Sequence, residues 1–225
     1  MAFFFKIMDN KDKSVALLLH DEVPSPIDFR RMEDALSWTK EANIKRPFRN
    51  DFFHAIEAVI KNINAPKTKV LELGAGPGFL GEYLLSRLPD LTYDLFDFSP
   101  AMHELSSQRL TPWQNQCRWL TGDFKQNGWS DHLKEYDIVV TMQTVHELRH
   151  KRYATSLHKS VLKLLRTNGV YLLCDHYVGE DGMSDQALYM TPGEHLESLT
   201  TAGFGLIDMI LKKSGLILFS VKLDK

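Results

Sequence analysis

The sequence lacks the features that mark secreted, disulfide-bonded or membrane-spanning proteins. Only two of its 225 residues are cysteines, Cys117 and Cys174, so no disulfide framework is expected and a reducing compartment is favoured. No apolar run approaches the roughly 20 residues that cross a bilayer. The apolar residues 1–8 lack the basic region of a signal peptide and are soon followed by charged residues. We therefore expect a cytoplasmic protein without a membrane partner.

An excess of basic charge is also missing. The chain has 27 Lys and Arg against 29 Asp and Glu, a net charge of −2, whereas a nucleic-acid partner usually demands a basic surface. Its 44% hydrophobic and 25% charged residues are typical of globular proteins. A chain of this length can bury a core without metals or disulfides. These values argue against a nucleic-acid partner and against a disordered or fibrous chain.

The N-terminal part of the chain predicts helices. Residues 1–24 contain two short apolar runs that fit either a hairpin or two helical turns. Ser25 followed by Pro26 is typical of a helix start, and helices are expected over residues 27–42 and 49–63. Apolar residues at helical spacing form one face of the second helix: Phe52, Phe53, Ile56, Val59, Ile60 and Ile63. We interpret residues 1–66 as a helical cap or lid and residues 67–225 as the main domain.

From Lys69 onward, apolar strands alternate with helices. Strands are expected over residues 70–73, 92–96, 118–120, 137–141 and 170–174, with helices over residues 79–88, after Ser99, from Tyr153 to Gly169 and after a capping box that runs from Thr191 to Glu194. Two final strands, residues 206–211 and 216–221, are joined by so short a link that they must be antiparallel. The pattern predicts an α/β fold of the doubly wound, Rossmann-like type. Its seven-stranded sheet is mostly parallel and ends in an antiparallel C-terminal hairpin.

A glycine-rich turn follows the first of these strands. The segment Val70-Leu-Glu-Leu-Gly74-Ala-Gly76-Pro-Gly78-Phe-Leu-Gly81 places four glycines where a buried strand turns into a helix. Glycine allows positive φ there and lets a ligand approach the backbone. Read as Gly76-x-Gly78-x-x-Gly81, the loop and Asp97 fit a dinucleotide site, so an NAD(P)-dependent oxidoreductase is an alternative. That reading places Gly74 inside the strand, where glycine is disfavoured, whereas Gly74-x-Gly76-x-Gly78 starts at the strand end.

The loop and three later features together resemble the class I S-adenosylmethionine-dependent methyltransferases. The later features are Asp97, the segment Leu120-Thr-Gly-Asp-Phe124 and the C-terminal hairpin, so the resemblance covers about residues 69–221. It implies that Asp97 holds the ribose hydroxyls, that Asp123 reaches the adenine amino group and that Glu72 lies near the methionine end. The implied cofactor site consists of Glu72, Gly74, Ala75, Gly76, Gly78, Asp97, Phe98, Met102, Gly122, Asp123, Phe124 and Gln143. Asp97, at a strand end, is expected to contribute little to folding.

The segment His146-Glu-Leu-Arg-His150 matches the zinc-protease pattern H-E-x-x-H. That pattern works when two histidines one helical turn apart share a face and a third ligand completes the site. Here the segment follows the fourth strand by only a few residues, which indicates a strand-to-helix loop. We therefore expect no metal site. The resembling family commonly carries a similar turn that faces the substrate.

The catalytic end is expected where the fourth and fifth strands end, because sheets of this type bind ligands there. His146 and His176 are candidate bases for an acceptor that must lose a proton. The loop after the fourth strand lacks the Asp/Asn-Pro-Pro-Tyr/Phe tetrad of methyltransferases that act on amide or nucleobase nitrogens. A small-molecule acceptor, methylated on oxygen or nitrogen by a monomer or homodimer, is therefore expected. A non-catalytic module that binds adenosylmethionine is the other alternative. Trp38, Arg46, Phe48 and Arg49 could line a lid, whereas Phe52 and Phe53 are expected to pack on the sheet.

Overall fold

The computed structural model describes residues 22–63, 67–133 and 135–224, which form alternating helices and strands. In chain order the elements are α2 (Met32–Lys45), α3 (Arg49–Lys61), β1 (Thr68–Leu73), α4 (Phe79–Leu85), β2 (Leu91–Asp97), α5 (Pro100–Arg109), η1 (Thr111–Gln116), β3 (Cys117–Thr121), β4 (Tyr136–Met142), η2 (Val145–Leu148), η3 (Lys151–Tyr153), α6 (Ala154–Leu164), β5 (Leu165–His176), α7 (Pro192–Ala202), β6 (Leu206–Lys213) and β7 (Leu216–Lys222). Across this part of the chain, none of the helices is both long and apolar enough to cross a membrane.

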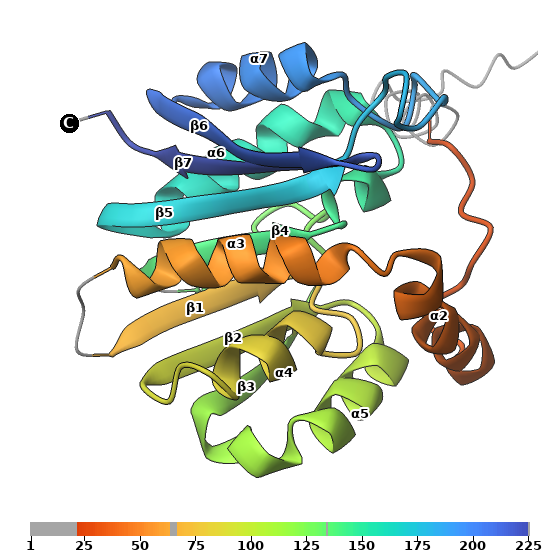
Figure 1. Ribbon diagram of the computed structural model, residues 1–225, viewed down its shortest axis with the longest axis vertical. Helices are drawn as coiled ribbons and strands as arrows, with labels where there is room; N and C mark the ends of the chain where they lie inside the picture. Colours follow the sequence, from red (N-terminus) through yellow and green to blue (C-terminus); the bar gives the residue numbers. More distant parts are fainter. Residues whose placement is uncertain (1–21, 64–66, 134, 225) are drawn as a thin grey trace, which may run out of the picture.

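The described strands form one seven-stranded sheet in the order β3-β2-β1-β4-β5-β7-β6 (Figure 1). The strands β1 to β5 pair in parallel, and β7 lies antiparallel between β5 and β6. The predicted mostly parallel sheet with an antiparallel C-terminal hairpin is therefore confirmed. All five parallel strands end at the same edge of the sheet, and this carboxyl edge is where such folds bind their ligands.

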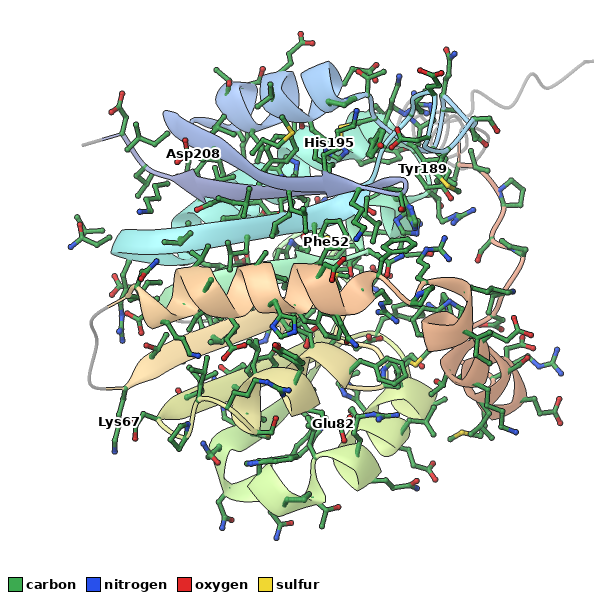
Figure 2. All side chains as sticks on the ribbon, in the orientation of Figure 1. Phe52, Lys67, Glu82, Tyr189, His195 and Asp208 are labelled. Atoms are coloured by element: carbon green, nitrogen blue, oxygen red, sulfur yellow. The ribbon has the colours of Figure 1, made fainter. Side chains whose placement is uncertain are left out.

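Helices cover both faces of the sheet because successive residues of a strand point to opposite sides. Val70 and Ile138 pack with Phe52 of α3 and with α4 on one face, whereas Leu71 and Val139 pack with α6 and α7 on the other. Figure 1 shows α3 and α4 in front of the sheet and α6 behind it. Figure 2 labels Phe52, which is completely buried between α3 and the sheet. The predicted apolar face of the second helix is confirmed.

The helix α2 lies apart from these layers. It sits beyond the carboxyl ends of the parallel strands, on the right of Figure 1. Its buried Ala35 packs against Ala101 and Met102 of α5. The described helices before β1 thus have different places: α3 belongs to the layers around the sheet, and α2 stands over the edge at which ligands bind.

The predicted helix start at Ser25 is wrong, because the first described helix begins only at Met32. Asp28 accepts a hydrogen bond from the amide two residues on, at 3.1 Å, which forms a turn rather than a helix. A distant residue also holds the segment, since Arg149 Nη2 donates to the carbonyl of Pro24 at 2.8 Å. The signal of serine and proline is thus overridden by long-range contacts. The expected hairpin or helical turns of residues 1–24 fall almost wholly outside the described residues.

The end of α6 also differs from the prediction. The helix ends at Leu164, because Leu165 already pairs with Tyr136 of β4. The strand β5 then bulges over the next residues and pairs again at Val170. A Cβ at Gly169 would lie 3.0 Å from the carbonyl oxygen of Tyr136. The glycine therefore marks the return of the chain to the sheet and not the end of a helix.

The start of α7 is as predicted. Thr191 Oγ1 accepts a hydrogen bond from the amide of Glu194 at 3.1 Å, and Glu194 Oε2 accepts one from the amide of Thr191 at 2.8 Å. This reciprocal pair satisfies two amides that the helix itself leaves without partners. The capping box fixes where the chain returns from the carboxyl edge of the sheet to its helical layer.

Candidate active site

A cavity of about 740 Å³ opens at the carboxyl edge of the sheet. Its walls come from the ends of β1, β2, β4 and β5, from α2 and from residues 23–29. Of the predicted site residues, those that line it are Glu72, Gly74, Ala75, Gly76, Asp97, Phe98, Met102, Phe124, Gln143, His146 and His176. Gly78, Gly122 and Asp123 are not among the lining residues. A cavity of this size is typical of sites for small molecules.

The glycine loop forms the wall at the end of β1. Gly74 has a φ of 66° and Gly76 a φ of 55°, which residues with a side chain rarely adopt. A Cβ at Gly74 would lie 2.3 Å from Cγ2 of Thr144, so the backbone there is packed too tightly for a side chain. A Cβ at Gly76 would instead meet no atom within 4 Å. The loop therefore presents bare backbone to open space, as a ligand that approaches the main chain requires.

Asp97 ties this loop to the end of β2. Its Oδ2 accepts a hydrogen bond from the amide of Gly76 at 2.8 Å, and its Oδ1 accepts one from the amide of Ser99 at 2.9 Å. Burial raises the pKa of Asp97, and these two amides oppose the rise. The carboxylate thus holds two loops as well as facing the cavity. The expectation that Asp97 contributes little to folding does not fit this geometry.

The far end of the cavity is apolar. Phe98, Met102 and Phe124 line it, next to the ends of β2 and β3. Asp123 turns elsewhere, since its Oδ1 accepts the amide of Lys125 at 2.9 Å. At Gly122, an added Cβ would lie 2.6 Å from the ring of a buried phenylalanine, so its role is close packing. An apolar wall suits a flat aromatic group such as adenine, and the predicted contact of Asp123 with adenine stays a prediction.

Two buried ionisable side chains, Glu72 and Arg49, face the cavity and lie near each other. Glu72 is 2% exposed, its Oε2 accepts a hydrogen bond from Tyr93 at 2.9 Å, and burial raises its pKa to about 8. Arg49 is 6% exposed and lies 5.4 Å from the ring of Phe79. Its Nε and Nη1 have no hydrogen-bond partner among the described residues, and burial lowers its pKa to about 10. A buried cation is costly without a partner, so the site fits a cofactor that brings a carboxylate.

His146 is held by a buried carboxylate. Its Nδ1 lies 2.6 Å from Oδ1 of Asp175, and its backbone amide donates to the other oxygen of Asp175 at 2.8 Å. Its Nε2 lies 3.3 Å from Oε1 of Glu147. Burial opposes the charged imidazolium, but Asp175 and Glu147 outweigh burial and raise the pKa of His146 to about 10. The ring is therefore fixed in orientation and stabilised as a cation.

His176 has a different environment, although its ring centroid is only 5.2 Å from that of His146. Its Nδ1 lies 3.2 Å from the carbonyl oxygen of Gly215, which assigns the ring proton to Nδ1. Its Nε2 then accepts from Gln143 Nε2 at 3.0 Å and from Arg46 Nη2 at 3.3 Å. Burial and the neighbouring His146 lower its pKa to about 4. Because the lone pair is already engaged, His176 is poorly placed to act as a base.

The segment from His146 to His150 is not a helix with both imidazoles on one face. It consists of two short 3₁₀ turns that are interrupted at Arg149, whose φ is 64°. His146 contacts Asp175, whereas His150 caps the second turn by accepting the amide of Arg152. In the described part of the chain, no cluster of three or more metal-ligating side chains was found.

Sequence reasoning missed part of the cavity wall near the ends of β4 and β5. The ring of Tyr189 lies 5.4 Å from that of His146 and 5.6 Å from that of His176, and Figure 2 places it at the carboxyl edge, on the side of α2. Arg149 lines the cavity, and its guanidinium donates hydrogen bonds to the carbonyls of Val23 and Pro24. No spacing in the sequence links these residues to the strand ends. Arg46 and Arg49, expected in a lid, do line the cavity.

Comparisons with known proteins agree with this geometry. Residues 71–171 match the family model described as methyltransferase domain. Non-reducing polyketide synthase prhL of Penicillium brasilianum is 29% identical over 126 residues, which cover 53% of this chain and 5% of the synthase. Acetylserotonin O-methyltransferase of Gallus gallus is 26% identical over 155 residues, which cover 62% of this chain and 43% of that enzyme. The matches thus span less than half the length of these curated relatives.

Two solved structures have the same fold at low identity. Human N-acetylserotonin methyltransferase, in complex with S-adenosylmethionine, is similar with a TM-score of 0.66 and 16% identity, covering 88% of this chain and 58% of that chain. A TehB-like S-adenosylmethionine-dependent methyltransferase of Corynebacterium glutamicum has a TM-score of 0.59 and 14% identity, covering 83% and 99%. Residues 71–171 therefore match the methyltransferase domain family, and the fold is that of the class I S-adenosylmethionine-dependent methyltransferases. The predicted family, fold and cofactor are confirmed, and the oxidoreductase alternative finds no support.

Proposed function

We propose that this protein transfers the methyl group of S-adenosylmethionine to an oxygen atom of a small molecule. The observation that carries the proposal is His146, which faces the cavity beyond the cofactor loop and is fixed by the buried Asp175 at 2.6 Å. A histidine in this place can hold or accept a proton at the attacking oxygen. The likeness to an acetylserotonin O-methyltransferase supports oxygen as the attacking atom.

The residues divide the work along the edge of the sheet. When bound, S-adenosylmethionine supplies an activated methyl group on a sulfonium. In our proposal the carboxylate of Asp97 binds the ribose, the apolar wall around Phe98 takes the adenine, and Arg49 pairs with the methionine carboxylate. Glu72, which lies near Arg49, faces the ammonium. Catalysis then rests chiefly on positioning and on exclusion of water.

His146 acts at Nε2, because Asp175 engages Nδ1. As an imidazolium it donates Nε2–H to an acceptor oxygen that is already ionised. As a neutral imidazole it takes the proton of a hydroxyl acceptor. In both cases the carboxylate of Glu147, whose Oε1 lies 3.3 Å from Nε2 of His146, must move away so that the acceptor can reach this nitrogen. Residues 1–66 contribute the cap in this proposal, through α2 and residues 22–31, which cover the cavity.

The test combines binding with product analysis. Calorimetry should detect S-adenosylhomocysteine in the micromolar range and no binding of NAD. Methyl-labelled S-adenosylmethionine, incubated with a panel of phenols, carboxylic acids and amines, should label only oxygen-containing acceptors, and the products should be identified as O-methyl compounds. Labelled amines alone, or strong NAD binding without any response to S-adenosylhomocysteine, would overturn the proposal.

A further inference from the structure

The acidic side chains on the cavity wall already have partners. Glu41 pairs with Lys45 at 2.5 Å, Glu72 accepts from a buried tyrosine, and Asp97 accepts from two backbone amides. Glu147 contacts His146 at 3.3 Å and an arginine at 3.4 Å. Asp34 accepts the amide of Asp28 at 3.4 Å, so each acidic side chain of the wall has a hydrogen-bond or ion-pair partner within the protein.

Two arginines on the same wall differ in this respect. Arg46 and Arg49 make no ion pair with any carboxylate among residues 22–63, 67–133 and 135–224. Arg49 lies near Glu72 at the end of β1 and also near Cys174 of β5, and its guanidinium is 5.4 Å from the ring of Phe79. We have assigned it to the single carboxylate of the cofactor. The guanidinium of Arg46 has no such assignment in the proposed function.

Arg46 belongs to the acceptor end of the cavity. Its Nη2 donates to Nε2 of His176, the last residue of β5, at 3.3 Å, and Gln143 donates to the same nitrogen from the end of β4. Neighbouring strands lie about 4.8 Å apart, so the end of β5 is about 10 Å from the glycine loop at the end of β1. Because Arg46 contacts the end of β5 rather than the glycine loop, we assign its guanidinium to the space for the acceptor.

His176 fixes the direction of this guanidinium. With its ring proton on Nδ1 and directed at the carbonyl of Gly215, its Nε2 can only accept. Arg46 gives one N–H to that nitrogen and keeps its remaining donors for the cavity. A planar guanidinium held in this way is well suited to a carboxylate, which it can bind through two hydrogen bonds.

From this arrangement we propose that the methyl acceptor carries a carboxylate and that Arg46, positioned by His176, binds it. The inference rests on the proposed function, because it treats the β4 and β5 end as the acceptor site. The cofactor strengthens the preference, since its sulfonium and ammonium add more positive charge than its carboxylate removes. The positive charge of protonated His146 also favours an acceptor that carries a carboxylate.

Binding of two matched probes tests the inference. 4-Hydroxybenzoate and 4-hydroxybenzamide have nearly the same shape and differ in charge. On the full chain saturated with S-adenosylhomocysteine, we expect calorimetry to show the benzoate binding at least about 10-fold more tightly than the amide, the gain of a hydrogen bond to a charged group. Arg46→Gln should reduce that ratio to about 2-fold or less, and Arg46→Lys, which keeps the charge, should retain most of it.

Lys45→Gln is the matched control, because it removes a neighbouring cation of the same wall that is already paired with Glu41. It should leave the ratio unchanged, and all three variants should bind S-adenosylhomocysteine as wild type does. Equal affinity for the two probes, no benzoate binding up to about 10 mM, or a full ratio in Arg46→Gln would overturn this inference alone. An equal loss in Lys45→Gln would also overturn it. Failure of wild type to bind S-adenosylhomocysteine would instead overturn the proposed function.

Discussion

The two halves of the cavity are built in different ways. The half that we assign to the cofactor, at the ends of β1 and β2, is organised around backbone groups: glycines with positive φ and amides that Asp97 holds in place. The half that we assign to the acceptor, at the ends of β4 and β5, is formed by side chains from distant segments, such as Arg46, His176 and Tyr189. A ligand shared by a whole family can be bound by a fixed loop, whereas a particular acceptor needs its own set of side chains. The predictions below test this division.

Replacing His146 should have the largest effect, and only on the acceptor half. In the proposed function, His146 holds or accepts the proton at the attacking oxygen. His146→Ala removes this group, so we expect turnover to fall about 10²-fold or more. Affinity for S-adenosylhomocysteine should stay within about 2-fold of wild type, because cofactor contacts lie elsewhere. His150→Ala, in the same segment, is the control and should leave both values nearly unchanged. Equal losses of turnover in the two variants would show that the loop acts as a structural unit.

A pH dependence of stability should come from Glu72. Burial raises the pKa of its carboxyl from the usual 4.5 to about 8 in the folded protein. The stabilisation from keeping the proton is fully present below pH 4.5 and is lost as the pH rises toward 8, because the unfolded chain then releases the proton more readily. The loss should be of the order of 2–4 kcal/mol. Urea unfolding of wild type and Glu72→Gln between pH 5 and 8 measures it.

The variant should lack this decline, because glutamine carries no proton to release and keeps an oxygen for the hydroxyl of Tyr93. Parallel stability curves for the two proteins over this range would show that Glu72 is ionised in the folded state.

Asp97→Ala should weaken cofactor binding by about 1.5–3 kcal/mol, the contribution of hydrogen bonds to a charged group. Unlike a residue that serves binding alone, it should also lower the free energy of unfolding, because the amides of Gly76 and Ser99 lose their acceptor. Asp97→Asn keeps one side-chain oxygen and should recover part of both losses. Calorimetry and urea unfolding measure the two effects, and unchanged stability in Asp97→Ala would refute the structural role.

Most residues that the sequence predicts for the cofactor do line the cavity, for a physical reason. The glycines, the strand before them and the acid after the next strand contact one another and are close in sequence. Their spacing in the sequence therefore predicts how they are arranged. The hairpin is equally local, because a short link allows only antiparallel pairing. The capping box at Thr191 works within one turn of helix and is likewise confirmed.

The acceptor half and the cap could not be predicted in the same way. The expected helix start at Ser25 fails because Arg149, more than a hundred residues away, holds the carbonyl of Pro24. Similarly, the surroundings of His176 could not be predicted from the sequence, because Gln143 and Arg46 approach its Nε2 from distant segments, and its role as a base stays a prediction. These contacts depend on the tertiary fold, and no local sequence pattern predicts them.

The smallest effect on stability is expected within the glycine loop, and it should differ between Gly74 and Gly76, which both have a positive φ. Gly76→Ala places an alanine at a φ of 55° but meets no atom within 4 Å, so only the left-handed conformation costs stability, by about 1–2 kcal/mol. Gly74→Ala has the same conformational cost and a Cβ 2.3 Å from Thr144, so it should be less stable than Gly76→Ala. Adding Thr144→Gly to Gly74→Ala should remove the excess, whereas adding it to Gly76→Ala should not help. Urea unfolding of the single and double variants measures these differences, and equal stability of the two alanine variants would show that Thr144 does not restrict the loop.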